Sequence, residues 1–425
     1  MNLVKKHGKN LISGILERQV KKLRKKHDFI VVAVVGSVGK TSTKLAIAKV
    51  LMTERSVRYQ EGNYNDQLTV PLVFFGHESP GIFNIFGWLK IFISNRKQIS
   101  RRFFPDIVVI ELGTDGPGQI ELFEYIHPDI AVVTAITAEH MEFFNSLDDV
   151  AKEELAVTKF SKKTIVNNDD IDAKYLKNIK NLLTYGLEKA DYKADTLPRK
   201  IGQVIKISKE DLSISKEIKL LGKQGAKTAL ASLAVANELG LGQQNILSGL
   251  GSLRAYSGRM NLLDGINGTT IIDDTYNASP AAVIAGLDVL YEIKSAQKIA
   301  ILGAMNELGK FAEESHRQIG KYCDSKKLEM VVTIGAMTEE FTALEAKNNG
   351  CEVYSFSSPF EAGDFVKTKL KKGAIIFAKG SQNRVFAEES LKVLLKNPDD
   401  INKLVRQGKY WLDIKEKQFG RRITP

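Results

Sequence analysis

Apolar residues along this chain fall into short continuous runs, separated by polar turns and by stretches with helical spacing. Continuous apolar runs of this length predict strands that are buried on both faces. In the first half of the chain the runs are Val31–Val35, Asp106–Glu111, Pro128–Thr134 and Thr164–Asn167. From about residue 252 onward they are Thr270–Asp273, Ile299–Gly303, Met330–Gly335 and Ala374–Ala378. Because these strands alternate with helical stretches, we expect an α/β fold with mainly parallel sheets.

A glycine turn follows the first of these runs and leads directly into a helix-like pattern. Glycines let backbone N–H groups turn inward around an anion, and the following helix adds its positive N-terminal end. The Lys40 ammonium can reach β- and γ-phosphate oxygens, and the Thr41 hydroxyl can take a Mg²⁺ ion. A glycine turn before an ordinary helix is the alternative, which the strand before the turn disfavours. We therefore predict a phosphate-binding loop whose nucleotide contacts are Gly36, Ser37, Val38, Gly39, Lys40, Thr41 and Ser42.

Polar residues follow further strands in the first half of the chain. In open α/β sheets, ligands bind beyond the carboxyl ends of the strands. Glu111 ends its strand, so we expect it to hold Mg²⁺ or a water molecule of that ion; a solvent-facing acid is the alternative. His140 follows the next strand between acids, which makes it a candidate ligand or acid–base group; a surface histidine is the alternative. The loop 62–72 adds Asn63 and Asn65, whose amides could reach phosphates or substrate.

The second half repeats this arrangement with two polar clusters. The sequence DDTYN occupies residues 273–277 at the end of one strand, and KGS occupies residues 379–381 at the end of another. Two polar clusters at strand ends of one sheet indicate a second ligand crevice. The residues of both clusters are candidate ligand contacts, and among them we expect Lys379 and Ser381 to contact substrate.

Two apolar stretches lie outside the strand pattern. Residues 1–28 place apolar side chains at helical spacing with Lys and Arg between them, which predicts a basic amphipathic helix. We expect this helix to dock its apolar stripe on the body of the protein; peripheral contact with an anionic membrane is the alternative. Residues 82–93, IFNIFGWLKIFI, are apolar and too short to span a bilayer. We expect them to form a core-packing helix, with an interfacial helix or a substrate lid as alternatives.

The composition is typical of a globular protein with two or three domains: 425 residues, 43% of them hydrophobic and 26% charged. Of the net charge of +11, +7 lies in the first 28 residues, and the small remainder argues against nucleic acid as a partner. Cys323 and Cys351 have no metal-binding or disulfide spacing, which fits a reducing compartment. Since no long apolar run and no signal-peptide pattern occur, we expect a cytoplasmic protein.

Several motifs together resemble the Mur ligase family, whose members use ATP to join an amino acid or peptide to a carboxylate. The motifs run in the family's order from about residue 29 to 385. They are GSVGKTSTK (36–44), GNYNDQLTVPL (62–72), VVIELG (108–113), PDIAVVTAITAEHMEFFNSL (128–147), GRM (258–260), DDTYNASP (273–280), GAMNELG (303–309) with His316, and KGS (379–381). Within the family they resemble most the member that adds D-alanyl-D-alanine to UDP-N-acetylmuramoyl-tripeptide.

The resemblance implies a division of the chain into domains. After the N-terminal helix (1–28), it implies a central P-loop domain that binds ATP on a mainly parallel sheet (29–250). A C-terminal Rossmann-like α/β domain (251–395) would close over it, followed by a tail (396–425). The family's chemistry is phosphoryl transfer from ATP to a carboxylate, after which an amine attacks the acyl phosphate.

The resemblance also implies roles for single residues. Lys40 would stabilise the transferring phosphoryl group, and Arg259 would reach the γ-phosphate from the C-terminal domain. Together with Lys40 and Arg259, we expect Glu111 and His140 to form the catalytic core. The expected metal ligands are Thr41, Glu111, His140 and Glu154, of which Glu154 aligns with a carbamoylated lysine of the family and is a shorter anion. Asp274 and Asn277 match positions that face the nucleotide.

Three further departures from the family concern substrate recognition. About 28 residues precede the first strand, so we expect the family's UDP-sugar-binding N-terminal domain to be absent. The family's G-x-H-N-x-x-N segment reads GKQGAKT at residues 222–228, without its His and Asn residues. The Asp of the family's GDM motif is Ala304, and the Arg after KGS is Gln382. These changes indicate a retained ATPase core with altered substrate contacts.

We therefore predict an ATP-dependent carboxylate–amine ligase that requires ATP and Mg²⁺ and acts in cell-wall peptide assembly. The expected partners are small molecules, namely a carboxylate acceptor and an amino acid or dipeptide, and the expected state is a monomer. A ligase of the same type on a polyglutamate or polymer-type substrate is one alternative. A nucleotide-binding scaffold that has lost ligation is the other, and intact Lys40, Thr41, Glu111 and His140 argue against it.

Overall fold

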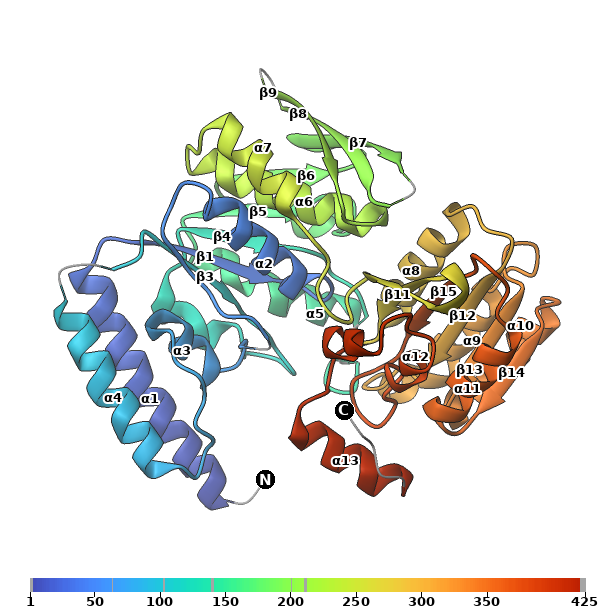
Figure 1. The fold of residues 1–425 in the computed structure, drawn as a ribbon. Coiled ribbons are helices and arrows are strands. Elements are labelled where there is room, and N and C mark those ends of the chain that lie inside the picture. Colours follow the sequence, from blue (N-terminus) through green and yellow to red (C-terminus); the bar gives the residue numbers. More distant parts are fainter. Residues whose placement is uncertain are drawn as a thin grey trace.

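Two sheets, each covered by helices on both faces, form the body of the protein (Figure 1). The computed structural model describes residues 3–62, 64–101, 104–138, 141–199, 201–209 and 212–420, and the side chains of residues 3–7 lie outside this description. Most strand pairs in both sheets are parallel. This confirms the α/β fold with mainly parallel sheets that the strand and helix pattern predicted.

The first sheet has nine strands within the described residues, in the order β2-β3-β1-β4-β5-β6-β7-β8-β9. They are β1 (Ile30–Val35), β2 (Val57–Arg58), β3 (Ile107–Glu111), β4 (Ile130–Val133), β5 (Lys163–Asn167), β6 (Leu182–Gly186), β7 (Tyr192–Pro198), β8 (Gln203–Lys209) and β9 (Leu212–Ile218). Pairing is parallel from β2 to β7 and antiparallel from β7 to β9. Because β3, β1 and β4 are parallel neighbours, the residues that follow them gather at one edge of the sheet.

The side chains of β1 alternate between two hydrophobic cores, which explains its uninterrupted apolar run. Val32 and Val34 pack in the core on one face, and Val31, Ala33 and Val35 pack in the core on the other. The first face is covered by α2 (Lys40–Leu51), α6 (Gly222–Glu238) and α7 (Gln243–Ser252). The second is covered by α1 (Leu3–Lys26), α3 (Thr69–Phe75), η1 (Glu121–Ile126), α5 (Leu147–Glu154), η2 (Leu155–Lys159) and η3 (Ala173–Tyr175).

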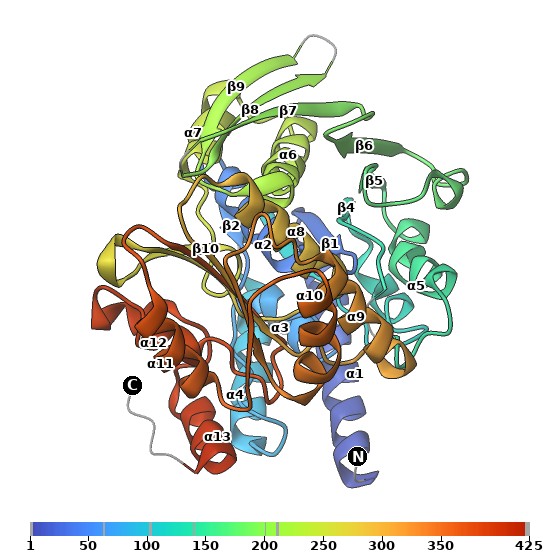
Figure 2. The same cartoon turned by 90° about the vertical axis from the view of Figure 1, so that its right-hand side faces the viewer.

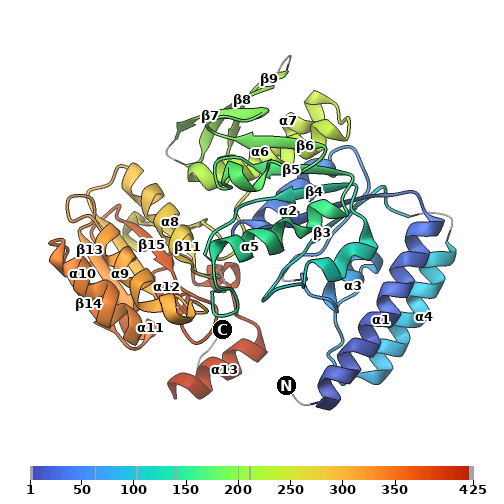
Figure 3. The same cartoon turned by 180° about the vertical axis from the view of Figure 1, so that it is seen from behind.

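Helices α1 and α4 (Ile85–Ser100) lie side by side and project from the central domain, as Figure 1 and Figure 3 both show. Leu16, Val20 and Leu23 of α1 are fully buried in the protein itself. This confirms the expected docking of the N-terminal helix on the body. The expectation of a core-packing helix at residues 82–93 holds for one face of α4 only, because the other face is exposed.

The second sheet has six strands in the part of the chain that is described, in the order β10-β11-β15-β12-β13-β14. It belongs to the domain that is turned toward the viewer in Figure 2. They are β10 (Asn261–Asp264), β11 (Thr270–Asp274), β12 (Lys298–Gly303), β13 (Met330–Ile334), β14 (Val353–Phe356) and β15 (Ile375–Lys379). All neighbours are parallel except β10 and β11. One face is covered by α8 (Pro280–Glu292), α9 (Ala312–Tyr322) and α10 (Ala343–Asn348), and the other by α11 (Pro359–Lys369) and α12 (Glu389–Lys392).

Short helices complete the second domain: η4 (Ile266–Gly268), η5 (Gly309–Phe311), η6 (Thr338–Thr342) and η7 (Pro398–Lys403). The last described helix, α13 (Lys409–Phe419), packs on this domain through the fully buried Lys415 and an edge-to-face contact of Trp411 with Phe386. Among the helices of the described residues, none combines the length and the apolar character needed to cross a bilayer.

Candidate active site

The predicted phosphate loop connects the end of β1 to the start of α2 at the edge of the first sheet. Gly36 and Gly39 have positive φ angles of 119° and 85°, which favour glycine. A Cβ atom at Gly36 would lie 2.5 Å from the Thr134 hydroxyl, so the loop also needs glycine for close approach. The Ser37 N–H donates to the Ala135 carbonyl over 2.8 Å, and the Ser37 hydroxyl donates to the Thr137 carbonyl over 3.2 Å. The segment after β4 therefore holds the loop in place.

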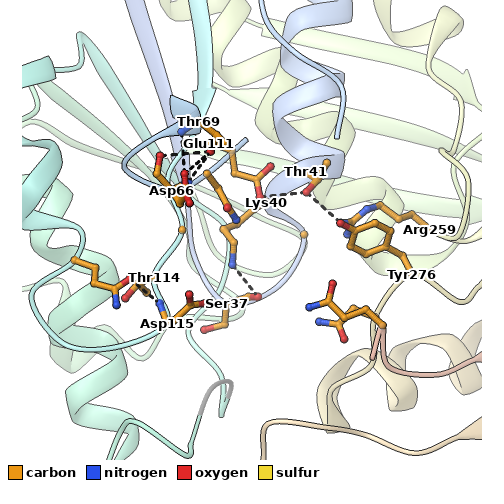
Figure 4. A pocket seen from close by; sticks show the side chains of 16 residues that line it. Ser37, Lys40, Thr41, Asp66, Thr69, Glu111, Thr114, Asp115, Arg259 and Tyr276 are labelled. Atoms are coloured by element: carbon orange, nitrogen blue, oxygen red, sulfur yellow. Dashed lines mark hydrogen bonds between the residues drawn. The ribbon is translucent and has the colours of Figure 1, made fainter. Parts of the chain in front are cut away.

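Lys40 is the first residue of α2, and its ammonium bends back over the loop. The Nζ atom donates to the Gly36 carbonyl over 2.5 Å and to the Ser37 carbonyl over 3.3 Å. The side chain lines the cavity that the loop borders (Figure 4). A flexible lysine held at the concave side of the loop can extend to phosphate oxygens when a nucleotide binds.

Thr41 and Glu111 meet beneath the loop and bring a hydroxyl and a carboxylate together. The Thr41 hydroxyl donates to Glu111 Oε1 over 3.2 Å, and both residues line the cavity (Figure 4). The second oxygen of Glu111, Oε2, lies 3.3 Å from Lys44 Nζ in an ion pair whose side chains are each 2% exposed. Burial lowers the pKa of Lys44, and the Glu111 carboxylate opposes that shift. Lys44 thus balances the charge of Glu111 from the side away from the cavity.

Arg259 reaches this site from the C-terminal domain. Its Nη2 atom donates to the Thr41 hydroxyl over 3.1 Å, and its guanidinium lies 4.2 Å from the centre of the Tyr276 ring (Figure 4). The turn that carries Arg259 is anchored by Asp273, which accepts the Gly258 N–H over 2.9 Å, and by Asp274, which accepts the Met260 N–H over 3.1 Å. The end of β11 therefore positions the arginine.

The two carboxylates at that strand end have different surroundings. Asp273 is fully buried and accepts hydrogen bonds from the Thr275 backbone and hydroxyl as well as from Gly258. Burial raises the pKa of Asp273 to about 6. Asp274 pairs with Lys379 on the neighbouring strand β15; burial raises the pKa of Asp274, and the Lys379 ammonium opposes the shift. Lys379 also donates to the Asn277 carbonyl over 2.9 Å.

A cavity of about 300 Å³ lies between the two domains and gathers most of these groups (Figure 4). Among the predicted site residues, those that line it are Ser37, Gly39, Lys40, Thr41, Asn65, Glu111, Arg259 and Asn277. Its other lining residues are Asp66, Thr69, Gly113, Thr114, Asp115, Gln119, Tyr276 and Gln382. The predicted residues Asn63 and His140 lie outside the described residues, so their roles stay predictions.

Several predicted residues contact protein groups beside the cavity. Ser381 is 1% exposed, accepts the Asn306 N–H over 2.9 Å and donates to the Ala278 carbonyl. Lys379 neutralises Asp274, as described above. The assignment of Lys379 and Ser381 to substrate stays a prediction, and in this structure both side chains organise the strand ends.

Glu154, at the end of α5, lies directly behind the phosphate loop. Its Oε2 atom accepts the Gly36 N–H over 2.8 Å, and the side chain is buried. The neighbouring Glu153 points elsewhere and accepts the N–H groups of Gly118 and Ile120. Glu154, not Glu153, is therefore the helix residue that touches the loop. Its role as a metal ligand stays a prediction.

His316, which belongs to one of the matching motifs, has a structural position. The ring is fully buried; Nε2 accepts the Met305 N–H over 3.0 Å, and Nδ1 lies 2.7 Å from the Ala312 carbonyl. Burial lowers the pKa of His316. The segment 222–228, where the family's histidine and asparagines are replaced, joins a polar cluster in which Lys227 pairs with Asp170 over 2.8 Å.

The sequence reasoning missed several cavity residues and one buried cation. Asp66, Thr114 and Asp115 follow the predicted Asn65 and Glu111 by only one to four positions. They could have been predicted by including the neighbouring loop residues as candidates. Lys44 stands one helical turn after Lys40, and its burial beneath Glu111 has no sequence signal of its own. Gln382 and Tyr276 follow predicted strand ends in the second domain.

The oxygen donors at the loop suit a hard cation. Thr41 and Glu111 offer a hydroxyl and a carboxylate next to the phosphate loop, and both residues line the cavity. The second carboxylate oxygen of Glu111 is neutralised by Lys44. Mg²⁺ in nucleotide sites is typically held by one or two carboxylates together with substrate phosphates. Within the described residues no group of three or more His, Cys, Asp and Glu side chains could hold a metal by itself. The residues present therefore fit a cation that arrives with a nucleotide.

A phosphate loop at one sheet edge, faced by an arginine from a second α/β domain, defines a two-domain nucleotide-dependent enzyme. Residues 100–236 match the model of the Mur ligase middle domain, and residues 258–382 match that of the Mur ligase, glutamate ligase domain. The chain belongs to the Mur ligase family.

Individual relatives cover most of the chain. A Bacillus subtilis protein named UDP-N-acetylmuramoyl-tripeptide--D-alanyl-D-alanine ligase is 26% identical over 380 residues, or 87% of this chain and 76% of the relative. A Synechocystis protein of the same name is 27% identical over 389 residues, or 89% of this chain and 77% of the relative. The crystal structure of MurF ligase from Thermotoga maritima in complex with ADP aligns with a TM-score of 0.75 and 24% identity, over 92% of this chain and 84% of that one. The last comparison shows a shared fold.

Proposed function

We propose that this protein is an ATP-dependent carboxylate–amine ligase that adds D-alanyl-D-alanine to a muramyl-peptide precursor of peptidoglycan. The observation that carries the proposal is the hydrogen bond from Arg259 to Thr41, which puts a cation of the second domain on the phosphate loop of the first. The relatives in B. subtilis and Synechocystis are named for this reaction and support the choice of substrates.

In the first chemical step, an oxygen of the acceptor carboxylate attacks the γ-phosphorus of ATP. The bond between that phosphorus and the β,γ-bridging oxygen breaks, so ADP leaves and an acyl phosphate forms. Charge builds on the transferring phosphoryl oxygens, where Lys40 and the amides of the loop can stabilise it. Arg259 supplies a second cation from the opposite side. Mg²⁺, held by Thr41 and Glu111 with the nucleotide, would neutralise the phosphate oxygens.

In the second step, the free amine of the dipeptide attacks the acyl carbon. A tetrahedral intermediate forms, and its collapse expels inorganic phosphate and leaves an amide, while the amine loses a proton. The cavity wall from the central domain carries Asn65, Asp66 and Asp115, which are suited to hydrogen-bond an amine or amide substrate. Asn277 and Gln382 offer amides from the other domain. Closure of the domains excludes water, which would otherwise hydrolyse the acyl phosphate.

The test is a measurement of phosphate release from ATP with purified full-length protein. We expect release only when both UDP-N-acetylmuramoyl-tripeptide and D-alanyl-D-alanine are present, with the ligated product seen by mass spectrometry. The Lys40→Ala variant should lose at least about 100-fold in kcat, because a cation at the transferring phosphoryl group is removed. Lys49→Ala, an exposed lysine on the same helix, is the matched control and should leave kcat unchanged.

Other outcomes would overturn parts of this proposal. Release with another acceptor or amine, such as a polyglutamate substrate, would keep the chemistry and reject the muramyl substrate. ATP binding without release for any acceptor–amine pair would favour a nucleotide-binding scaffold. Wild-type turnover by Lys40→Ala would reject the phosphate-loop assignment.

The remaining expectations are part of the same proposal. We propose a monomer, because Arg259 and the phosphate loop of one chain already form both walls of the cavity. The buried free thiols of Cys323 and Cys351 and the use of ATP support a cytoplasmic compartment. Size-exclusion chromatography with light scattering tests the first point.

A further inference from the structure

The helices α1 and α4 form a parallel pair that stands out from the central domain (Figure 3). Gln19 of α1 donates to the Phe92 carbonyl over 3.1 Å and accepts from the Asn95 amide over 2.7 Å. Directly after the end of α1, His27 Nε2 lies 3.1 Å from the carbonyl of Ile99 in α4. Buried polar contacts of this kind fix the rotation of α4, so the direction in which its outer face points is defined.

That outer face carries large apolar side chains that are exposed to solvent in the described part of the protein. We call it the α4 apolar face, and it includes the residue two positions before the helix. Its members are Phe83 (77% exposed), Ile85 (70%), Phe86 (79%), Leu89 (50%) and Ile93 (54%). Residues 85, 89 and 93 are spaced by four, so they form one stripe along the helix.

The opposite face of α4 accounts for the packing of this helix. Trp88 and Ile91 are buried with Leu16 and Leu72 in a small core of their own. The buried stripe of α4 thus packs the helix pair together. The exposed stripe buries no apolar area in this structure and therefore adds nothing to that packing. Several large apolar side chains exposed together on one helix face usually mark an interaction surface.

The charges around the α4 apolar face have one sign. The sequence from Pro80 to Phe104 holds no acidic residue, and Lys90, Arg96 and Lys97 are exposed on α4. In α1 the only acid is Glu17, among nine Lys and Arg residues. Exposed phenylalanine and aliphatic side chains can insert at the boundary between lipid headgroups and acyl chains. The flanking cations, with no acid between them, are attracted to anionic headgroups.

We propose that the α4 apolar face docks the protein on an anionic lipid bilayer, with Phe83, Ile85 and Phe86 entering the interface and the lysines and arginines contacting lipid phosphates. The docking is peripheral, because α4 lies along the surface and does not span it. Of the two segments considered from sequence, residues 82–93 carry most of these exposed apolar side chains. Leu16, Val20 and Leu23 of α1 are buried in the protein, so in this proposal α1 contributes mainly charge and α4 contributes the apolar contact. The inference stands independently of the proposed reaction.

The helix pair is attached next to the cavity. Lys9 of α1 pairs with Asp66 over 3.3 Å, and Asp66 lines the cavity between the domains. The helix pair that carries the α4 apolar face therefore also contacts one residue of the cavity wall. Binding to vesicles should leave turnover of soluble substrates intact, because the α4 apolar face shares no residue with the cavity.

The experiment is co-sedimentation of the full chain with vesicles of phosphatidylglycerol and phosphatidylcholine in equal parts, compared with vesicles of phosphatidylcholine alone. We expect binding to the anionic vesicles, weakening with added salt, and little binding to the neutral ones. The double variant Phe83→Ser, Phe86→Ser should lower the partition coefficient by about tenfold or more. A double variant of exposed apolar residues elsewhere, Leu197→Ser and Leu344→Ser, is the matched control and should bind as wild type does.

A charge variant separates the two contributions. Lys90→Glu, Arg96→Glu and Lys97→Glu together should abolish the preference for anionic vesicles, while Lys367→Glu, Lys369→Glu and Lys372→Glu, exposed in the other domain, should keep it. Unchanged thermal unfolding of the variants shows that the fold is intact. Equal binding of the phenylalanine variant and wild type would overturn the proposal. So would a wild-type protein that ignores vesicles and dimerises through these phenylalanines, which would assign the α4 apolar face to a second copy of the chain.

Discussion

The Arg259 guanidinium donates to the Thr41 hydroxyl over 3.1 Å, although the two residues are 218 positions apart in the chain. Thr41 in turn donates to Glu111, so one hydroxyl joins the arginine of the second domain to the carboxylate of the first. The contact is a direct measure of domain closure, because it exists only when both domains face the same cavity. The predictions below test this relationship and the groups that hold it.

Replacing Arg259 should affect the chemical step more than nucleotide binding. Arg259→Gln keeps a hydrogen-bond donor and loses the charge, so we expect kcat to fall by about 100- to 1,000-fold while ADP affinity changes only a few-fold. Phosphate-release kinetics and calorimetric titration with ADP measure the two quantities. Arg199→Gln, at an exposed position on the rim of the first sheet, serves as control. A loss confined to ADP affinity would mean that Arg259 binds the ground state.

The Thr41 hydroxyl should set the magnesium requirement. Thr41→Ser retains the hydroxyl, whereas Thr41→Val keeps the shape and removes it. We expect the valine variant to need a much higher Mg²⁺ concentration for nucleotide binding and turnover, and the serine variant to resemble wild type. Titration of ADP affinity against Mg²⁺ tests this without turnover. Identical magnesium curves for both variants would exclude Thr41 as a ligand.

Glu154 offers two roles that two substitutions separate. Its carboxylate accepts the buried Gly36 N–H, and an unsatisfied N–H there would cost about 1–3 kcal/mol. Glu154→Ala should therefore lower thermal stability, while Glu154→Gln keeps an acceptor and should retain most of it. If the charge of Glu154 serves a metal, Glu154→Gln should still raise the Mg²⁺ requirement. If Glu154→Gln and wild type show the same dependence of nucleotide affinity on Mg²⁺ concentration, Glu154 serves only to support the loop.

A buried ion cluster behind Tyr276 should support the position of Arg259. Arg406 pairs with Glu388 over 2.6 Å and donates to the Tyr276 carbonyl over 2.9 Å, while Lys415 of α13 pairs with Glu388 over 2.9 Å. Removing one partner of a buried pair costs about 3–5 kcal/mol, so Arg406→Ala should sharply lower the melting temperature.

Arg406→Lys gives the test of positioning. It keeps the charge and loses the two-pronged geometry, so we expect a smaller loss of stability with a clear loss of kcat. KM for ATP should change little, since Arg406 does not line the cavity. Wild-type kcat in Arg406→Lys would show that the cluster serves stability alone.

Asp273 should make stability fall as the pH rises. Its folded-state pKa of about 6 lies above the ordinary value of 3.8, so the folded state holds the proton more tightly than the unfolded state. The corresponding stabilisation is complete below pH 3.8 and is lost as the pH rises through 6. The shift of about two units amounts to about 3 kcal/mol. Asp273→Asn does not titrate, so wild type should lose about 2 kcal/mol relative to the variant between pH 4 and pH 6, and the rest outside that window.

Urea unfolding at several pH values checks this prediction. The quantity to compare is the difference in free energy of unfolding between wild type and Asp273→Asn, followed as a function of pH. The asparagine variant will be less stable overall. Gly258 and Thr275 donate to different oxygens of Asp273, so the NH₂ group that replaces one oxygen must face one of these N–H donors. A constant difference between pH 4 and pH 6 would contradict the assigned pKa.

Local pattern was sufficient wherever a few neighbouring residues carry the chemistry. The turn 36–39, the lysine and threonine that follow, and the strand-end Glu111 all came from short-range rules and lie at one cavity. Arg259 has no local signal, and only the resemblance to a family of known ligases indicated it. Lys379 shows what local pattern left open: its strand-end position predicted a substrate contact, which stays a prediction, and the parallel register of β11 and β15 sets it beside Asp274.

By itself, the sequence determined the strands and helices, the phosphate loop and the family, because each depends on spacing over a few residues or on motifs in order. The tertiary structure decided which face of α4 is buried, which glutamate of α5 touches the loop, and that Arg259 meets Thr41. These choices depend on packing between segments that are far apart in the chain, where burial of apolar area and pairing of buried charges select one arrangement among many that the local patterns allow.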